Sequence, residues 1–494
     1  MALPKICGIE TEYGIAVREA TEFNPILTSS LLINAYAKPA FKRVKWDYEE
    51  ESPLRDARGF DRAPADAAIE DDTGLVNVIL PNGARYYVDH AHPEYSSPEC
   101  SNARDAVIWD KAGERILEDS IAAAQSMVPD GERVFIYKNN SDGKGNSYGT
   151  HENYLVDRKV PFAEIVKHLT PFFVSRQIYT GAGKVGAENT NDSVDYQISQ
   201  RADFFEVEVG LETTFKRPII NTRDEPHADP EKYRRLHVIV GDANMCQIPI
   251  FLKIGATSLV LKMIEDEFIA DDLTLREPVR SMRAVSHDTS CRAPLELADG
   301  RSITAIELQW EYLRLAKKYV QEYEDQDEIT ADVVDRWERV LDRLEDDPMT
   351  LSRELDWVAK LSLLEAYRER DSLEWDHPKL QLIDLQYHDV QREKGLYWKL
   401  ESSGKVDTIV TEDEIRRAVD HPPEDTRAYF RGECLRRFSH VIVAASWDAL
   451  IFDTGDEPLR KVPTMEPMRG TKQHVQALLD DSPDASRLLA NLSR

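Results

Sequence analysis

The sequence predicts an α+β fold in which one large, mostly antiparallel sheet packs against helices and a small C-terminal α/β domain follows. Strand-like runs up to residue 245 alternate apolar and polar side chains, which is typical of an antiparallel sheet with one working face. From 303 to 400 the apolar residues recur at helical spacing, with charges on the opposite face. The stretch 421–427 then reads as a proline-containing linker, which predicts domains at 1–425 and 426–494.

The individual elements follow from local patterns. A helix over 24–38 has Asn24 or Thr28 available as its N-cap. The stretch 42–74 is dense in charge, contains proline and glycine and shows no period, so we expect a long, mobile loop there. The other predicted elements are a strand at 5–16, a hairpin over 76–95 with a Pro-Asn-Gly turn, a helix at 103–127, two strands within 132–156 around a glycine-rich hairpin link, strands at 204–215 and 236–245, and strand-like then helical segments after 427.

Composition limits the class of protein. The chain has 494 residues and a net charge of −28, which argues against general binding to nucleic acid or to anionic membranes. Its five cysteines show no C-x-x-C spacing, which favours reduced thiols in a cytoplasm. The N-terminus lacks the apolar region of a signal peptide, and no apolar run reaches the length of about 18 residues needed to span a membrane. Because no heptad or symmetric patch stands out, we expect a cytoplasmic monomer.

Two glutamates near the N-terminus raise the question of chemistry. In GIETEYGI, Glu10 and Glu12 are separated by one residue, so a strand would point both carboxylates to the same face. Neighbouring carboxylates repel each other unless a positive group lies between them. Either this is a solvated edge strand, or it is a divalent metal site built from oxygen ligands.

The run ARYYVDHAHPE repeats this pattern on another predicted strand. Arg85, Tyr87 and Asp89 alternate with apolar residues and therefore share one face, and Glu94 and Ser97 follow closely. A cation, a phenol and a carboxylate are costly on a core face unless they bind something. An exposed face would also carry them, so this run does not decide the matter alone.

Further polar residues mark two more predicted strands. His151 is followed by Glu152, but Leu155 excludes a helical H-E-x-x-H zinc motif. Arg235 and His237 lie at the mouth of another strand, where an arginine suits a phosphate. The run GAGKVG at 181–186 matches a dinucleotide pattern only weakly, since no strand-turn-helix surrounds it. Acids and arginines spread over one sheet suggest a Mg²⁺–nucleotide complex held on its face.

The same residues resemble a known family. GIETEYG, NPILTSS, WDYEEESPLRDARGFD, ARYYVDHAHPEYSSPE, YGTHENYL, GDANMCQ, ASWDALIF and MRGTKQHV resemble the Dop/PafA family of the Pup modification system, from residue 6 to near residue 476. The resemblance implies a curved nucleotide-binding sheet similar to glutamine synthetase and other carboxylate–amine ligases. The charged 42–74 stretch and the HAHPE run after Asp89 resemble the deamidase/depupylase branch more than the ligase branch.

The resemblance implies an activity and a set of cofactors. The deamidase/depupylase branch hydrolyses the side-chain amide of the C-terminal glutamine of Pup and the isopeptide bond between Pup and a substrate lysine. It uses ATP, or ADP plus phosphate, as a bound cofactor together with Mg²⁺. Pup and pupylated proteins are therefore the implied partners. KRPIINTR and LRKVPTMEPMR are candidate docking segments for this acidic partner, although basic clusters are usually just solvated.

Residue roles follow from the matched positions. Asp89 matches the catalytic aspartate, which either attacks the γ-carbonyl or activates water. Glu10, Tyr87 and Glu94 match metal positions, with Glu12, His151 and His237 as completing ligands or nucleotide contacts. The other matched residues are Arg85, Ser97, Arg235 and Trp447 for the nucleotide, and Arg201 and Arg223 for phosphates or the substrate carboxylate. The competing hypotheses are a Pup–protein ligase and a catalytically silent Pup-binding adaptor.

Overall fold

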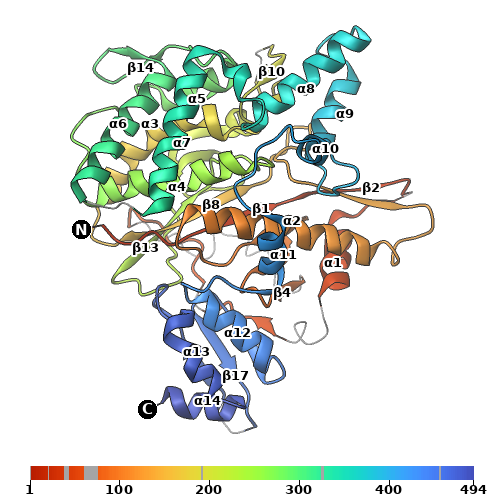
Figure 1. The fold of residues 1–494 in the computed structure, drawn as a ribbon, viewed down its shortest axis with the longest axis vertical. Coiled ribbons are helices and arrows are strands. Elements are labelled where there is room, and N and C mark those ends of the chain that lie inside the picture. The colour runs from red at the N-terminus through yellow and green to blue at the C-terminus, as the bar shows by residue number, and fades with distance from the viewer. Residues whose placement is uncertain are drawn as a thin grey trace.

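The computed structural model describes residues 2–20, 22–37, 44–49, 51–59, 76–190, 193–323, 327–455 and 458–493. A six-stranded sheet of order β13-β8-β1-β6-β5-β4 crosses the middle of the molecule, and all of its strand pairs are antiparallel (Figure 1). Its strands are β1 (Cys7–Glu12), β4 (Asn77–Ile79), β5 (Arg85–Asp89), β6 (His92–Ser96), β8 (Thr150–Asp157) and β13 (Tyr233–Val238). The predicted α+β fold with a largely antiparallel sheet is confirmed.

Alternation along the strands gives this sheet two chemically different faces. In β5, Tyr86 and Val88 are buried in the main core, while the residues between them lie at the opposite face. In β1, Ile9 joins the same core, and Glu10 and Glu12 line a cleft on the other face. Helices α1 (Pro25–Tyr36) and α2 (Ala103–Ala124) pack against these strands. The polar face is thereby left open for a functional site.

Helix α1 begins as predicted, because the Asn24 side chain accepts a hydrogen bond from the Leu27 backbone N–H.

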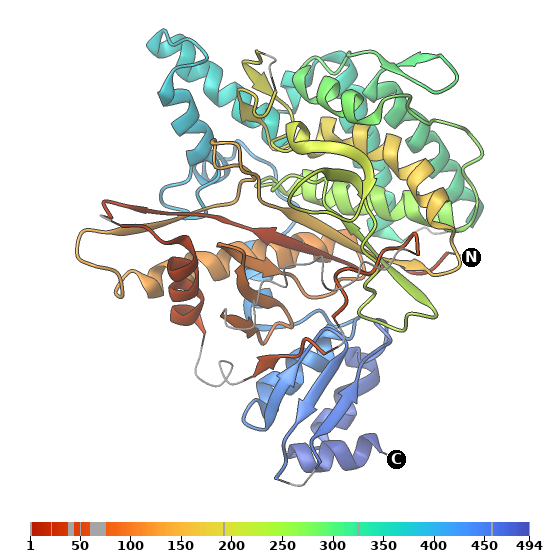
Figure 2. The ribbon, with the colours of Figure 1, turned by 180° about the vertical axis from the view of Figure 1, so that it is seen from behind.

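A layer of helices lies above the sheet in Figure 1, and Figure 2 shows the same layer from behind. It contains α3 (Phe162–Thr180), α4 (Gln247–Glu265), α5 (Pro278–His287), α6 (Ala305–Tyr323) and α7 (Glu328–Asp346). Four helices continue the chain: α8 (Asp356–Asp371), α9 (Pro378–Tyr387), α10 (Leu396–Ser402) and α11 (Glu412–Asp420). The helical pattern predicted for 303–400 is confirmed.

Among the described residues, only α4 is long and apolar enough to cross a membrane. Within its most apolar window, 89% of the residues are buried inside the protein. That burial is what a central core helix requires, since a helix that is apolar all round packs on every side.

The C-terminal part of the chain forms a separate lobe, at the bottom of both ribbon views (Figures 1 and 2). Its four-stranded sheet has the order β18-β17-β16-β3. The elements of the lobe are β3 (Lys45–Trp46), α12 (Ala428–Phe438), β16 (Ile442–Ala445), β17 (Ala449–Phe452), β18 (Arg460–Pro463), α13 (Lys472–Asp480) and α14 (Ala485–Leu492).

Strand β3 corrects the prediction of a continuous loop over 42–74. Residues 45–46 pair in parallel with β16, and Val44 and Trp46 belong to the hydrophobic core of the lobe. The lobe expected from residue 426 onward therefore takes one strand from far earlier in the chain. Residues 51–59 are also placed, and Ala57 donates its N–H to the carbonyl of Thr222 at 2.8 Å. The rest of this stretch lies outside the described residues.

The glycine-rich link before β8 turns back on itself as predicted, through an antiparallel bridge between Ser141 and Ser147. Its flanking strands do not pair with each other, because β7 (Arg133–Tyr137) pairs with β2 (Gly14–Arg18), whereas β8 pairs with β1 and β13. Strands β11 (Phe205–Gly210) and β12 (Arg217–Asn221) form a parallel pair after the short helix η4 (Ala202–Phe204). Minor elements are β9 (Lys184–Val185), β10 (Tyr196–Gln197), β14 (Leu295–Glu296), β15 (Ser302–Ile303) and η5 (Pro348–Leu351).

Candidate active site

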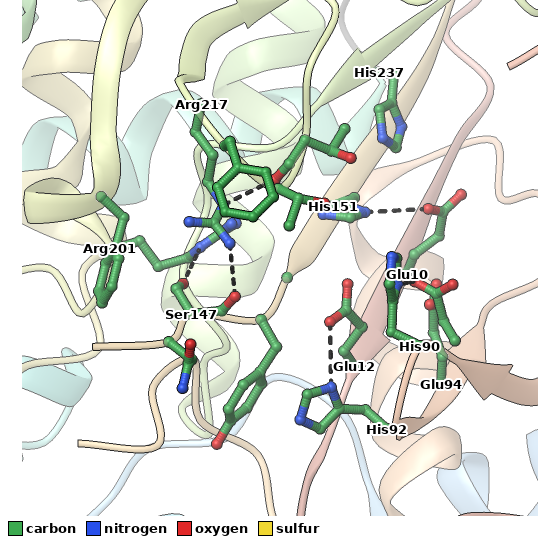
Figure 3. A pocket seen from close by; sticks show the side chains of 18 of the residues that line it. Glu10, Glu12, His90, His92, Glu94, Ser147, His151, Arg201, Arg217 and His237 are labelled. Atoms are coloured by element: carbon green, nitrogen blue, oxygen red, sulfur yellow. Dashed lines mark hydrogen bonds and ion pairs between the residues drawn. The ribbon is translucent and has the colours of Figure 1, made fainter. Parts of the chain in front are cut away.

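A cleft of about 860 Å³ lies over the polar face of the sheet. Figure 3 shows side chains from separate strands pointing into it. The sequence-predicted residues that line it are Glu10, Glu12, Arg85, Tyr87, Asp89, Glu94, His151, Arg201, Arg223 and His237. A second, smaller cavity of about 80 Å³ contains the three remaining predicted residues, Ser97, Arg235 and Trp447. Glu10 lines both cavities, so the two lie next to each other.

Strand register brings the acidic residues together. Glu12 of β1 lies opposite Glu94 of β6, and Glu94 in turn lies opposite Tyr87 of β5. On the other side of β1, Glu10 lies opposite His151 of β8. Directly opposite residues in an antiparallel pair are near neighbours, so residues distant in the chain meet at one place.

The first group of side chains is centred on Glu10. Its carboxylate lies 3.4 Å from Nδ1 of His151 and accepts a 2.8 Å hydrogen bond from the Asn153 side chain. The rings of His151 and His237 meet edge to face at 4.8 Å. Burial opposes ionisation of Glu10, but the hydrogen bond from His151 and the charges of His237 and Arg235 hold its pKa well below the usual value. Ligand atoms of Glu10, His151 and His237 all lie within 4.8 Å of one another, as a metal site requires.

The second group contains three carboxylates. Ligand atoms of Glu12, Asp89 and Glu94 also lie within 4.8 Å of one another. Burial, followed by the negative charges of Asp89, Glu10 and Glu12, raises the pKa of Glu94 well above its usual value. A divalent cation would offset this repulsion, and carboxylate oxygens are the ligands that Mg²⁺ prefers. The donor set therefore fits a divalent cation.

Asp89 is held in its ionised form by its surroundings. Burial raises its pKa, but the hydrogen bond from His90 and the positive charges of His90, His151 and Arg85 outweigh that effect and lower the pKa. Nδ1 of His90 lies 3.1 Å from the carboxylate. His92 lies on the other side of the group, 3.7 Å from Glu12, and its buried Nδ1 has no hydrogen-bond partner among the described residues. Neither His90 nor His92 was singled out from the sequence, although both belong to the HAHPE run.

Arg85 is held in place by aromatic rings. Its guanidinium lies 3.8 Å from the ring centre of Tyr87 and 4.1 Å from that of Trp46 in β3. The Trp46 indole donates a 2.6 Å hydrogen bond to Glu51. Arg223, a second predicted arginine, has a buried Nε without a partner among the described residues. The described part of the 42–74 stretch thus forms one wall of the cleft.

Arg201 lies on another wall and is only 1% exposed. It donates to the hydroxyl of Ser147 at 3.3 Å, and Arg217 donates to the carbonyl of the same residue at 2.8 Å. Burial, with the nearby charge of Arg217, lowers the pKa of Arg201 to about 10. Arg217 was not assigned a role from the sequence, although it lies in the basic segment KRPIINTR.

The second cavity lies where the C-terminal lobe meets the main sheet. Trp447 and Pro467 come from the lobe, and Pro226, His227 and Arg235 come from the main body. The largely apolar lining has the chemistry of a slot for an aromatic base. The predicted Ser97 is also here, but its hydroxyl already accepts from the Ile9 N–H at 2.9 Å and donates to the Pro98 carbonyl at 3.2 Å.

Comparisons with known proteins identify relatives over the whole chain. The chain is 58% identical to a depupylase of Acidothermus cellulolyticus, over 99% of both chains. It is 53% identical to a Pup deamidase/depupylase of Mycolicibacterium smegmatis, over 99% of this chain and 100% of the relative. A Pup–protein ligase of a Nocardioides species is 44% identical, over 82% of this chain and 90% of the relative.

Solved structures and a family model agree with these relatives. The Pup ligase PafA in its complex with Pup has a TM-score of 0.81 and 34% identity, covering 97% of this chain and 92% of that one. PafA in complex with ADP has a TM-score of 0.75 and 38% identity, covering 82% and 90%. The family model described as Pup-ligase protein matches residues 5–451. The family predicted from the motifs is therefore confirmed, and the chain belongs to the Pup-ligase protein family.

Proposed function

We propose that this chain is a Pup deamidase and depupylase. It hydrolyses the side-chain amide of the C-terminal glutamine of Pup, and it cleaves the isopeptide bond that links Pup to a lysine of another protein. The observation that carries the proposal is the identity of 58% and 53% to a depupylase and to a deamidase/depupylase over 99% of this chain. The identity to the Pup–protein ligase of Nocardioides is 44%, over 82% of this chain, so ligation is the less favoured function.

Asp89 is the residue that performs the central step. Its lowered pKa keeps it ionised at neutral pH, and it lines the cleft beside Glu12 and Glu94. The carboxylate either attacks the γ-carbonyl carbon or takes a proton from an attacking water. In both cases the C–N bond breaks, the amine leaves as ammonia or as the lysine amine, and water supplies the oxygen of the new carboxylate.

ATP, or ADP plus phosphate, together with Mg²⁺ completes the proposed site. The residues that would hold the cation are Glu10, His151 and His237 of the first group and Glu12 and Glu94 of the second, with Tyr87, which lies opposite Glu94. A bound cation would supply positive charge that stabilises the phosphate oxygens and the developing oxyanion. Arg235, Ser97 and Trp447 line the cavity proposed for the nucleotide, and the PafA relative is solved with ADP.

The proposed partners and setting follow from the same assignment. The PafA relative is solved in complex with Pup, which supports Pup as the partner here, and pupylated proteins are the second substrate class. From the composition we propose that the protein is a cytoplasmic monomer that binds neither nucleic acid nor a membrane.

Intact-mass measurement tests the function directly. Purified protein, Mg²⁺–ATP and Pup ending in glutamine are incubated, and the small mass increase that accompanies replacement of –NH₂ by –OH is followed. We expect Asp89→Asn to slow the reaction by at least about a hundredfold, because a general base or nucleophile is lost. Asp335→Asn, on the exposed side of α7, is the matched control and should retain activity. Conjugation of Pup to added protein, without deamidation, would assign the chain to the ligases.

A further inference from the structure

One side chain beside the two cavities has no role assigned from the sequence. Asn153 lies in the middle of β8, directly opposite Gly8 of β1 and His237 of β13. One residue separates it from His151, so the side chains of both point to the polar face of the sheet. Asn153 also lines the second cavity. It therefore lies on the strand between the two strands that carry Glu10 and His237.

The orientation of the Asn153 amide follows from two charged partners. Its nitrogen donates a 2.8 Å hydrogen bond to Oε1 of Glu10, and an ionised carboxylate only accepts. Its oxygen accepts a 2.6 Å hydrogen bond from Nη1 of Arg235, and a guanidinium only donates. Exchanging the two amide atoms would place donor against donor and acceptor against acceptor. Only one orientation of the amide therefore satisfies both partners.

The same amide oxygen orients the ring of His237. Nδ1 of His237 lies 3.1 Å from this oxygen, and an amide oxygen has no proton to donate. Nη1 of Arg235 lies 3.3 Å from the same Nδ1, but it is closer to the amide oxygen, at 2.6 Å, and donates there. Nδ1 of His237 therefore carries the ring proton and donates it to Asn153. The lone pair of the neutral ring is then on Nε2, as in histidines that bind a metal through that nitrogen.

Asn153 thereby joins the second cavity to the first group of candidate metal ligands. Arg235 lines that cavity, and its other donors go to Glu225: Nε to the carbonyl at 2.7 Å and Nη2 to the carboxylate at 3.3 Å. Glu10 lines both cavities and belongs with His237 to the first group. Nη1 of Arg235 lies 3.8 Å from Glu10, which is too far for a hydrogen bond. The Asn153 amide bridges that gap with one hydrogen bond to each of them.

We propose that Asn153 is a positioning residue that couples occupancy of the second cavity to metal binding at Glu10 and His237. The inference rests on the proposed function, in which that cavity holds a nucleotide. Asn153 restrains a carboxylate and an imidazole that would otherwise rotate, so a cation meets preorganised ligands. An anion that binds Arg235 holds in place the group that fixes the amide oxygen. ADP should therefore tighten metal binding, and the metal should tighten ADP binding by the same factor.

Calorimetry with Mn²⁺ and ADP tests this coupling. The affinity for Mn²⁺ is measured with and without ADP, and the ratio of the two affinities is the coupling factor. Asn153→Leu keeps the side-chain volume but removes the amide. We expect it to weaken Mn²⁺ binding to the nucleotide-free protein about tenfold and to lower the coupling factor about fivefold. ADP affinity in the presence of EDTA should change much less.

Two further variants separate positioning from a general disturbance. Asn153→Gln keeps both amide atoms and should restore part of the Mn²⁺ affinity and part of the coupling factor. Asn491→Leu removes another half-buried amide, which donates to Ser482 at 3.3 Å in the C-terminal lobe, and should behave as wild type. Binding of Mn²⁺ by ADP itself is the same with every variant, so it cancels from the comparison.

The ring tautomer of His237 gives a second measurement, on the wild-type protein. Its ring nitrogens are observed by NMR without metal and are identified as the signals that His237→Asn removes. We expect a protonated Nδ1 and an unprotonated Nε2. A ring protonated on Nε2 alone would exclude the hydrogen bond to Asn153 and would overturn the proposal, even if Asn153→Leu failed to fold.

The calorimetric results can also contradict the assignment. Equal weakening of Mn²⁺ and ADP binding in Asn153→Leu, with the coupling factor unchanged, would reduce Asn153 to a structural role, and so would an unchanged Mn²⁺ affinity. Wild type that shows the Asn153-dependent coupling but does not deamidate Pup would support the positioning role and reject the proposed function. Deamidation by wild type, with the same coupling factor in Asn153→Leu, would reject the positioning role alone.

Discussion

Oε2 of Glu10 lies 3.4 Å from Nδ1 of His151, across the β1–β8 pair. With His237 these residues form a group that offers one carboxylate and two imidazoles. Mg²⁺ prefers oxygen ligands, whereas imidazole nitrogen suits transition metals. The two candidate metal-binding groups of the cleft thus differ in donor chemistry, since the other is formed by three carboxylates.

Metal preference should reflect this difference. We expect nucleotide-free protein to bind Mn²⁺ or Co²⁺ more tightly than Mg²⁺. His237→Asn should lower the ratio of the transition-metal affinity to the Mg²⁺ affinity about tenfold or more. Isothermal titration calorimetry with each metal measures the affinities. His421→Asn, at an exposed helix end, is the control and should leave the ratio unchanged. An equal ratio in wild type and His237→Asn would show that His237 is not a ligand.

Trp447 should contribute to nucleotide affinity from the C-terminal lobe. Its ring packs edge to face on Trp46 at 5.4 Å, and it lines the smaller cavity. We expect Trp447→Ala to weaken ADP binding about tenfold because base–aromatic stacking contributes about 1–3 kcal/mol. Trp447→Phe should recover part of the affinity. The measurement is ADP titration by calorimetry, with Trp310→Ala on α6 as a control; ADP affinity that does not change in Trp447→Ala would remove Trp447 from the site.

Glu99 should make the docking of the C-terminal lobe depend on pH. It forms ion pairs with Arg427 at 2.7 Å and with Arg431. Burial opposes its ionisation, but the charges and hydrogen bonds of Arg431 and Arg427 lower its pKa to about 2. The pKa of Glu99 in the folded protein lies below the ordinary value of 4.5. The stabilisation that the two ion pairs give to the folded protein is therefore complete above pH 4.5 and is lost as pH falls toward 2.

Urea unfolding of Glu99→Gln measures that contribution. We expect the variant to lose about 3 kcal/mol of unfolding free energy at pH 7 and the same amount at pH 5, with a smaller difference below pH 4.5. Glu424→Gln removes a half-exposed partner of Lys472 and should cost at most about 1 kcal/mol. A difference that grew as pH fell would contradict this sign.

Gly113 of α2 should be required for close packing behind the site. A Cβ at this position would lie 2.4 Å from Cδ1 of Tyr95, which precedes Ser96 in β6 and is 2% exposed. Gly-to-Ala substitution inside a helix normally stabilises, but here we expect a loss of about 1–3 kcal/mol from overpacking. Thermal unfolding checks this, and a second substitution, Tyr95→Leu, should recover part of the loss. A higher melting temperature in Gly113→Ala would show that the ring moves aside freely.

The alternation of polar residues in the sequence was sufficient to predict which side chains share a face. Glu10 with Glu12, and Arg85 with Tyr87 and Asp89, all line the cleft as their spacing indicates. Side-chain direction along a strand has a period of two regardless of what surrounds it. The long motifs likewise identified the family, because they specify residues rather than only a pattern of polarity.

Strand pairing was not accessible from local pattern. The sequence indicates that residues 45–46 lie in a loop, yet they complete the sheet of a lobe whose other strands begin at 442. A strand of only two residues has no detectable periodicity, and its pairing is decided by the hydrophobic core that Trp46 joins. Local pattern likewise does not show that β7 and β8, on either side of the glycine-rich link, each pair with a different strand.

The sequence by itself therefore determined the chemistry available to this protein: acids and arginines on a sheet face, and membership of its family. The tertiary structure decided how those groups are divided. It placed Ser97, Arg235 and Trp447 around a separate cavity that shares Glu10 with the cleft, and it brought Arg217 beside Arg201 through their common contact with Ser147. The reason is physical: spacing along one strand fixes direction, whereas distance between strands depends on register and packing, which arise only when the whole chain folds.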